Sequence, residues 1–183
     1  CCIRLSEIPL FMKILEVCPI PDLKIEEVLT ALRRILLLDR SKLSTNKDLL
    51  RFQIPLALQC FTNEYIYEET EDETVAIKAL EASLQKSFSN SEEPLPCDIA
   101  CLASYRSLFD CPWARDITPS SALEPLFKRQ VMEVNEELVL KEDIPRLNSI
   151  ENDVSLAVQN QYEENPYPRW VSTRLEIKPR SIN

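Results

Sequence analysis

The chain has 183 residues, 45% of them apolar, and its 30 acidic side chains outnumber its 21 basic ones to give a net charge of −9. Neither glycine nor histidine occurs, which argues against phosphate-binding loops and against nucleophilic hydrolases that need an imidazole base. The acidic balance argues against nucleic acid and anionic membranes as partners. We therefore expect a chain with no catalytic activity of its own.

Two further features concern where the protein works. The longest aliphatic run, 35–38, is far shorter than the roughly 20 residues of a membrane-spanning helix. Seven cysteines, several of them on apolar helical faces, fit a reduced interior. We expect a soluble, cytoplasmic protein without a membrane contact. Because the chain begins with cysteine and no targeting segment precedes its first amphipathic stretch, we expect an internal fragment. A mature lipoprotein is the alternative.

Helical periodicity runs through almost the whole sequence. Ser6 should cap a first helix that stops at Pro19, and Asp22 should cap a second, so that the two form a hairpin. On the second helix Arg33 and Arg34 should face outward. The residues expected to face inward are Ile25, Val28, Leu29, Leu32, Ile35 and Leu36.

Proline residues, which end or interrupt helices, divide the rest of the chain into separate helical segments. Further helices are predicted at 47–67, 75–88, 97–109, 121–138 and 150–162. Pro55 should kink the first of these. The expected fold is all-α, with about seven helices in an irregular bundle. We expect a helical accessory domain over 1–164 and an extended proline and aromatic arm over 165–183, with strand-like alternation only from 171 to 177.

One polar group lies within an otherwise apolar helical pattern: Gln59, Asn63, Glu64 and Tyr65. Buried polar groups need partners, since an unsatisfied one costs about 1–3 kcal/mol. The pattern favours a structural network that pins this helix to its neighbours, with Tyr105 and Arg106 as partners. A ligand site is the alternative.

Two places in the sequence could bind a metal ion. Cys97 and Cys101 are four residues apart with Cys111 following, which could bring three thiols to one ion. The same spacing is what a buried helical stripe produces, so core packing is favoured over a metal-binding redox site. The acidic run 68–73 could hold a hard cation, but a solvated helix start is favoured there. No metal is expected.

The run QYEENPYPRW at 161–170 alternates prolines with large aromatics, which favours an extended arm. It resembles the segment that precedes the catalytic domain in a group of bacterial class I S-adenosylmethionine-dependent methyltransferases, often with tetratricopeptide repeats upstream. Segments 28–38, 56–67 and 102–114 resemble the helical region of that family. Similarity therefore spans most of the chain, and the ten-residue run is its specific part.

The resemblance implies a helical accessory domain that acts as scaffold, substrate-selecting surface or lid for a methyltransferase domain. The glycine-rich loop that would hold S-adenosylmethionine is not in this sequence, so the cofactor is expected only in a longer parent protein. Expected partners are that downstream domain and, further, a protein substrate or upstream repeats. The alternative is a free-standing helical protein-interaction module. The resemblance also implies an interdomain hinge or lid made of Tyr162, Asn165, Pro166, Tyr167, Pro168, Arg169 and Trp170.

Overall fold

The computed structural model describes residues 1–43, 47–143, 156, 158 and 161. They divide between two units, Cys1–Asp143 and Ile144–Asn183. The elements of the first unit are α1 (Cys2–Ser6), α2 (Pro9–Val17), α3 (Leu23–Leu38), α4 (Arg40–Leu43), η1 (Lys47–Leu49), α5 (Leu50–Thr62), α6 (Glu71–Ser89), α7 (Pro96–Ala103), η2 (Leu108–Asp110), η3 (Pro112–Arg115), α8 (Glu124–Phe127), η4 (Lys128–Met132) and α9 (Glu133–Asp143). The described part is helical without strands, which confirms the all-α prediction.

The first helices differ from their predicted caps. Ser6 ends α1 instead of capping a helix, and its hydroxyl donates to the Ile3 carbonyl at 2.7 Å. A fresh helix, α2, then begins with Pro9 in its first turn. The cap predicted for α3 is confirmed, because the Asp22 carboxylate accepts the backbone N–H groups of Lys24 and Ile25, each at 3.0 Å. This arrangement satisfies donors that a helix start would otherwise leave unpaired.

Helix α3 is rotated relative to the prediction. The sequence pattern places Arg33 outside, yet only 1% of its surface is exposed. The same pattern places Val28 and Ile35 inside, yet they are 50% and 49% exposed. The physical reason is that Arg33 lies on the same helical face as Leu29 and Leu36, which are buried, so this face carries the arginine into the interior.

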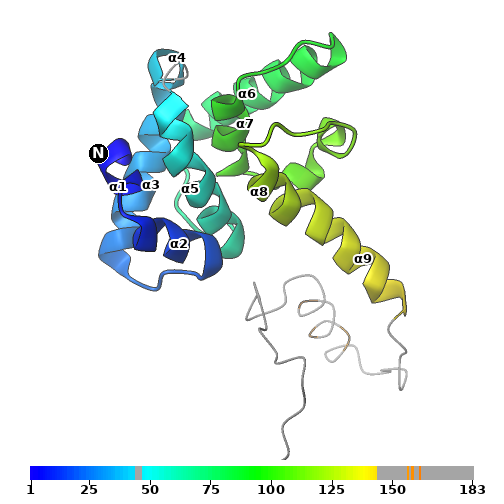
Figure 1. The fold of residues 1–183 in the computed structure, drawn as a ribbon, viewed down its shortest axis with the longest axis horizontal. Helices are drawn as coiled ribbons and strands as arrows, with labels where there is room; N and C mark the ends of the chain where they lie inside the picture. Colours follow the sequence, from blue (N-terminus) through cyan, green and yellow to red (C-terminus); the bar gives the residue numbers. More distant parts are fainter. Residues whose placement is uncertain (44–46, 144–155, 157, 159–160, 162–183) are drawn as a thin grey trace, which may run out of the picture. The chain divides into compact units, whose positions relative to one another are not determined.

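Helix α5 lies centrally, between α2 on one side and α7 on the other (Figure 1). It ends at Thr62, earlier than the predicted residue 67, and Pro55 lies within it. Every residue from Pro55 to Thr62 is buried. Its side chains enter two apolar clusters, one with α1, α2 and α3, the other with α6, α7 and α8. The helix therefore joins both halves of the core.

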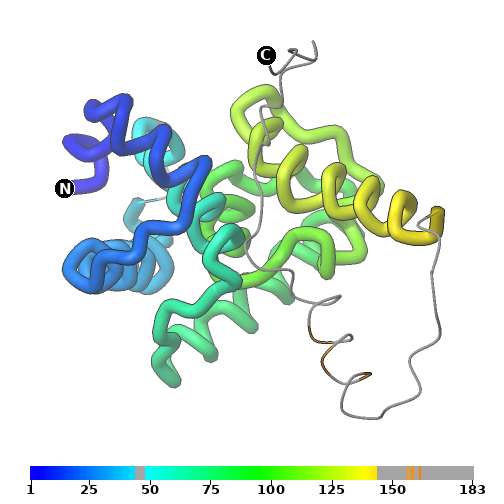
Figure 2. Tube along the Cα trace, turned by 90° about the horizontal axis from the view of Figure 1, so that it is seen from below, coloured from blue at the N-terminus to red at the C-terminus, as the bar shows by residue number. Residues whose placement is uncertain are grey.

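The helices in the second half of this unit differ in their bounds from the prediction. Helix α6 begins at Glu71, four residues before the predicted 75, and ends at Ser89. Helix α7 ends at Ala103, and the expected continuation to residue 109 is replaced by the turn of η2. The predicted helix over 121–138 is observed as α8, a π-helical turn η4 and α9 in succession, which form one continuous rod in Figure 2. Gln130 lies in η4 and is fully buried.

In the second unit, Leu156, Val158 and Gln161 are helical. The predicted arm over 165–183 with its strand-like alternation, the predicted hinge or lid residues from Tyr162 to Trp170, and the predicted domain boundary at 164 lie outside the described residues. Among the helices described, none combines the length and apolar character needed to cross a membrane.

Candidate functional site

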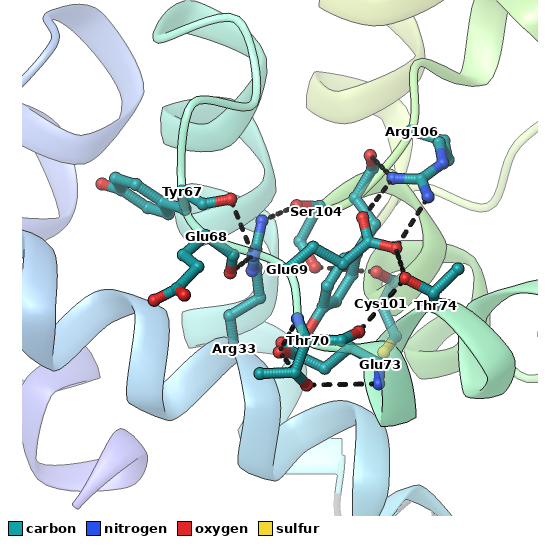
Figure 3. Close-up of polar contacts among 11 residues, drawn as sticks. Arg33, Tyr67, Glu68, Glu69, Thr70, Glu73, Thr74, Cys101, Ser104 and Arg106 are labelled. Carbon is teal, nitrogen blue, oxygen red and sulfur yellow. Dashed lines mark hydrogen bonds and ion pairs between the residues drawn. The ribbon is translucent and has the colours of Figure 1, made fainter.

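Arg33 is a buried arginine on α3 that binds two other segments of the chain, before α6 and after α7 (Figure 3). The Arg33 guanidinium donates to the carbonyls of Tyr67 at 3.2 Å, Glu68 at 2.7 Å and Ser104 at 3.5 Å. Its charge also lies 4.1 Å from the centre of the Tyr105 ring. Carbonyl dipoles and an aromatic face are both favourable surroundings for a cation removed from water.

Glu73 is a fully buried carboxylate next to this arginine site. One oxygen accepts the Tyr105 hydroxyl at 2.6 Å. The other accepts the backbone N–H and hydroxyl of Thr70, at 3.0 and 2.8 Å, and Arg34 Nε at 3.0 Å. Thr70 is the N-cap of α6 and Glu73 its third residue, so the two form a capping box. The same carboxylate thus closes the start of α6 and binds α3.

The protonation of these groups follows from their contacts. Burial favours the neutral form of Glu73, but the hydrogen bonds from Tyr105, Thr70 and Arg34 outweigh it and lower its pKa to about 2. Burial and donation to Glu73 raise the pKa of Tyr105 above its ordinary value. At neutral pH the pair is therefore a carboxylate bound by a neutral phenol. Such a pair holds helices together and does not exchange protons near pH 7.

A second ion pair lies beside it, nearer to solvent. Arg106 donates to both oxygens of Glu69, at 2.8 and 3.0 Å. The Thr74 hydroxyl donates to the same carboxylate at 2.8 Å. The Arg106 hydrogen bond is the main reason that the pKa of Glu69 is lowered. We call Arg33, Arg34, Glu69, Thr70, Glu73, Tyr105 and Arg106 the α3–α6–α7 network.

The residues predicted from sequence as one polar network are divided between different neighbours. Gln59 is fully buried. With its amide nitrogen toward α2, it donates to the carbonyls of Leu15 at 3.1 Å and Cys18 at 2.9 Å, and its oxygen accepts the N–H of Ile20 at 3.1 Å. It therefore fixes the end of α2 to α5.

Asn63 is the C-cap of α5, and its backbone N–H donates to the Gln59 carbonyl at 3.0 Å. Glu64 and Tyr65 follow with φ values of 60° and 57°. That left-handed region is one that glycine usually takes, so this glycine-free chain turns sharply on two ordinary residues. The Tyr65 hydroxyl donates to the Ala103 carbonyl at 3.4 Å, at the end of α7. The expected partners Tyr105 and Arg106 bind the carboxylates of Glu73 and Glu69.

Gln130 is a buried polar residue to which sequence reasoning gave no polar role. Its amide nitrogen donates to the carbonyls of Ala57 at 3.3 Å and Ala103 at 3.1 Å, and its oxygen accepts the N–H of Leu108 at 3.1 Å. The π-helical turn in which it lies is a widened turn that often marks a special side-chain placement. A glutamine amid Leu126, Phe127 and Val131 was the only signal in the sequence.

The three cysteines considered as metal ligands are positioned as core residues. Cys97 and Cys101 are buried on α7, and Cys111 is half-buried before η3. Burial raises the pKa of Cys101 to about 12 and that of Cys111 to about 11, which disfavours the thiolate that binds metal. Within the ranges that the structure describes, no three cysteine or acidic side chains converge as a metal centre would require.

The surface carries an open groove between α6 and the turns η2 and η3. It consists of two adjoining hollows of about 440 and 310 Å³, both lined by Gln85, Pro112 and Trp113. We call it the α6–η3 groove. It lies in the first unit and contains no member of the α3–α6–α7 network.

Comparisons with known proteins add no relative. No family model, no curated protein and no solved structure matches the chain.

Proposed function

We propose that residues 1–143 form a non-catalytic helical accessory domain that serves a class I S-adenosylmethionine-dependent methyltransferase domain. In this role it acts as a scaffold, as a substrate-selecting surface or as a lid. The observation that supports a non-catalytic role is the α3–α6–α7 network. Its buried ionisable groups, Arg33, Glu73 and Tyr105, all bind neighbouring helices or segments of the same chain. The link to a methyltransferase rests on the sequence run at 161–170.

The first test is calorimetric titration of the 183-residue chain with S-adenosylmethionine, with an active methyltransferase as positive control. We expect no heat of binding, because the sequence has no glycine at which its backbone could closely approach the cofactor. Saturable heat with one molecule bound per chain would overturn the proposal.

A second candidate function is a free-standing protein-interaction module, which the open α6–η3 groove favours. The gene downstream of the Asn183 codon distinguishes the two. A strand and a glycine-rich loop encoded there in the same reading frame would support the accessory domain. A stop codon directly after this residue would support the free-standing module and contradict the leading proposal.

A further inference from the structure

The wall of the α6–η3 groove formed by α6 is a single helical stripe. Lys78, Glu81, Gln85 and Phe88 follow one another at three- or four-residue intervals and all line it. Residues at this spacing lie on one face of a helix. The wall is therefore straight over more than two helical turns, which is the length of a short peptide segment and not of a compact metabolite.

The base of the groove is aromatic. The rings of Phe88 and Trp113 are stacked with their centroids 4.4 Å apart and their planes at 20°. Trp113 is 7% exposed and belongs to the core cluster, and Phe88 packs against that cluster. The packed core therefore fixes the position of both rings. Ile117 continues the apolar lining at one end and Ala82 in the middle. A rigid apolar base of this kind suits an inserted aliphatic or aromatic side chain.

The rim of the groove is acidic. Glu81 lies on the α6 wall, Asp110 and Asp116 lie on the opposite wall, and Lys78 is the lone cation among the described residues that line the two hollows. Within the part of the chain that the structure describes, none of these three carboxylates is in an ion pair. Burial raises the pKa of the half-buried Cys111 thiol, and the negative charges of Glu81 and Asp110 raise it further. Both carboxylates therefore act on the same part of the groove.

From this geometry we propose that the α6–η3 groove binds a cationic amphipathic segment of a partner protein. Lysine or arginine side chains of that segment pair with Glu81, Asp110 and Asp116, while an apolar side chain rests on the Phe88–Trp113 stack. Charge complementarity selects this partner: the groove has three carboxylates against one ammonium, and the whole chain has a net charge of −9. The proposal does not depend on the link to a methyltransferase.

The test uses the full chain and a short fluorescein-labelled peptide in which lysine and arginine alternate with leucine. Fluorescence anisotropy measures binding, and a peptide with glutamate at the basic positions is the probe control. One variant combines Glu81→Gln, Asp110→Asn and Asp116→Asn. Its matched control, Glu7→Gln with Glu27→Gln and Glu136→Gln, removes the same charge from exposed positions outside the groove.

A second pair of variants tests the shape of the groove without touching its base. Ala82→Arg places a bulky cation in the groove, whereas Ala79→Arg places it on the same helix outside the lining. Both positions are exposed, and arginine is a good helix former, so both proteins should fold. Circular dichroism and thermal melting check this directly.

We expect the triple groove variant to weaken peptide binding by about tenfold, as the loss of several screened ion pairs predicts. Ala82→Arg should weaken binding to a similar extent, because its side chain occupies the groove and its charge repels a cationic peptide. The two matched controls should bind the peptide within about twofold of the natural chain. A change of charge outside the groove alters only the long-range electrostatic attraction, which salt screens. Equal weakening in groove and control variants would overturn the proposal, because it would show only attraction to net charge. No binding by the natural chain, or binding of the glutamate peptide at equal strength, would overturn it as well. Self-association that the groove variants abolish would instead identify a second copy as the occupant.

Discussion

Replacing Glu73 by glutamine removes the charge from the most enclosed carboxylate of the α3–α6–α7 network. The side chain is fully buried and accepts from Tyr105, from two groups of Thr70 and from Arg34. An amide of the same shape keeps one acceptor oxygen, but it turns an NH₂ donor toward groups that are themselves donors. The variant therefore loses the charged bonds and leaves a buried donor facing donors, for which we expect a large destabilisation.

The magnitude follows from the protonation of the native protein. A pKa of about 2 for Glu73, against an ordinary 4.5, corresponds to about 3 kcal/mol of folding free energy at neutral pH. Urea unfolding followed by circular dichroism should show Glu73→Gln less stable than the natural chain by about this amount. The matched control is Glu71→Gln, an exposed residue in the same helical turn, which should lose less than about 0.5 kcal/mol.

The pH dependence gives an independent check. Because the pKa of Glu73 is lower in the folded than in the unfolded chain, its contribution is complete above about pH 4.5 and is lost as the pH falls toward 2. In Glu73→Gln this part of the acid destabilisation should be missing, so the difference between the two proteins should shrink between pH 4.5 and 2. A difference below about 1 kcal/mol at pH 7, or one that does not change in this interval, would refute the reasoning.

Two further predictions concern buried groups. Arg33→Lys should lower the free energy of unfolding in urea by at least about 2 kcal/mol, because an ammonium cannot reproduce the planar guanidinium that reaches three carbonyls. The control Arg51→Lys, at an exposed position, should be nearly neutral. Equal effects of the two substitutions would contradict the assigned contacts. Exposed Cys18 should react quickly with a thiol reagent in the native protein, whereas Cys60 and Cys101, whose pKa values burial raises to about 12, should react only on unfolding. Rapid native labelling of either buried thiol, mapped by mass spectrometry, would show that the core is open there.

The all-α character was predictable because period and proline spacing are local properties. The capping box at Thr70 and Glu73 was missed, although a threonine followed three residues later by glutamate is a known helix start. The acidic run 68–73 was expected to be solvated, yet Glu73 within it is fully buried. Arg33 could have been placed inside, because it lies four residues after Leu29 and three before Leu36 on the apolar face. The pattern rule that assigns charge to the surface led to the wrong orientation.

Other features depend on contacts that no local pattern contains. The bond between Tyr105 and Glu73 joins residues 32 positions apart, and that between Gln130 and Ala57 joins residues 73 apart. The α6–η3 groove likewise exists only because the turn containing Trp113 folds back onto Phe88. The predicted arm over 165–183 and the methyltransferase link that rests on the run at 161–170 stay predictions.

The position of α5 has a consequence for how the first unit comes apart. Because this helix is enclosed along almost its whole length and supplies side chains to both apolar clusters, neither cluster can open without exposing it. The two halves should therefore lose their structure in a single cooperative step. The amide hydrogens of α5 should then exchange with deuterated solvent more slowly than those of α9, which buries no side chain.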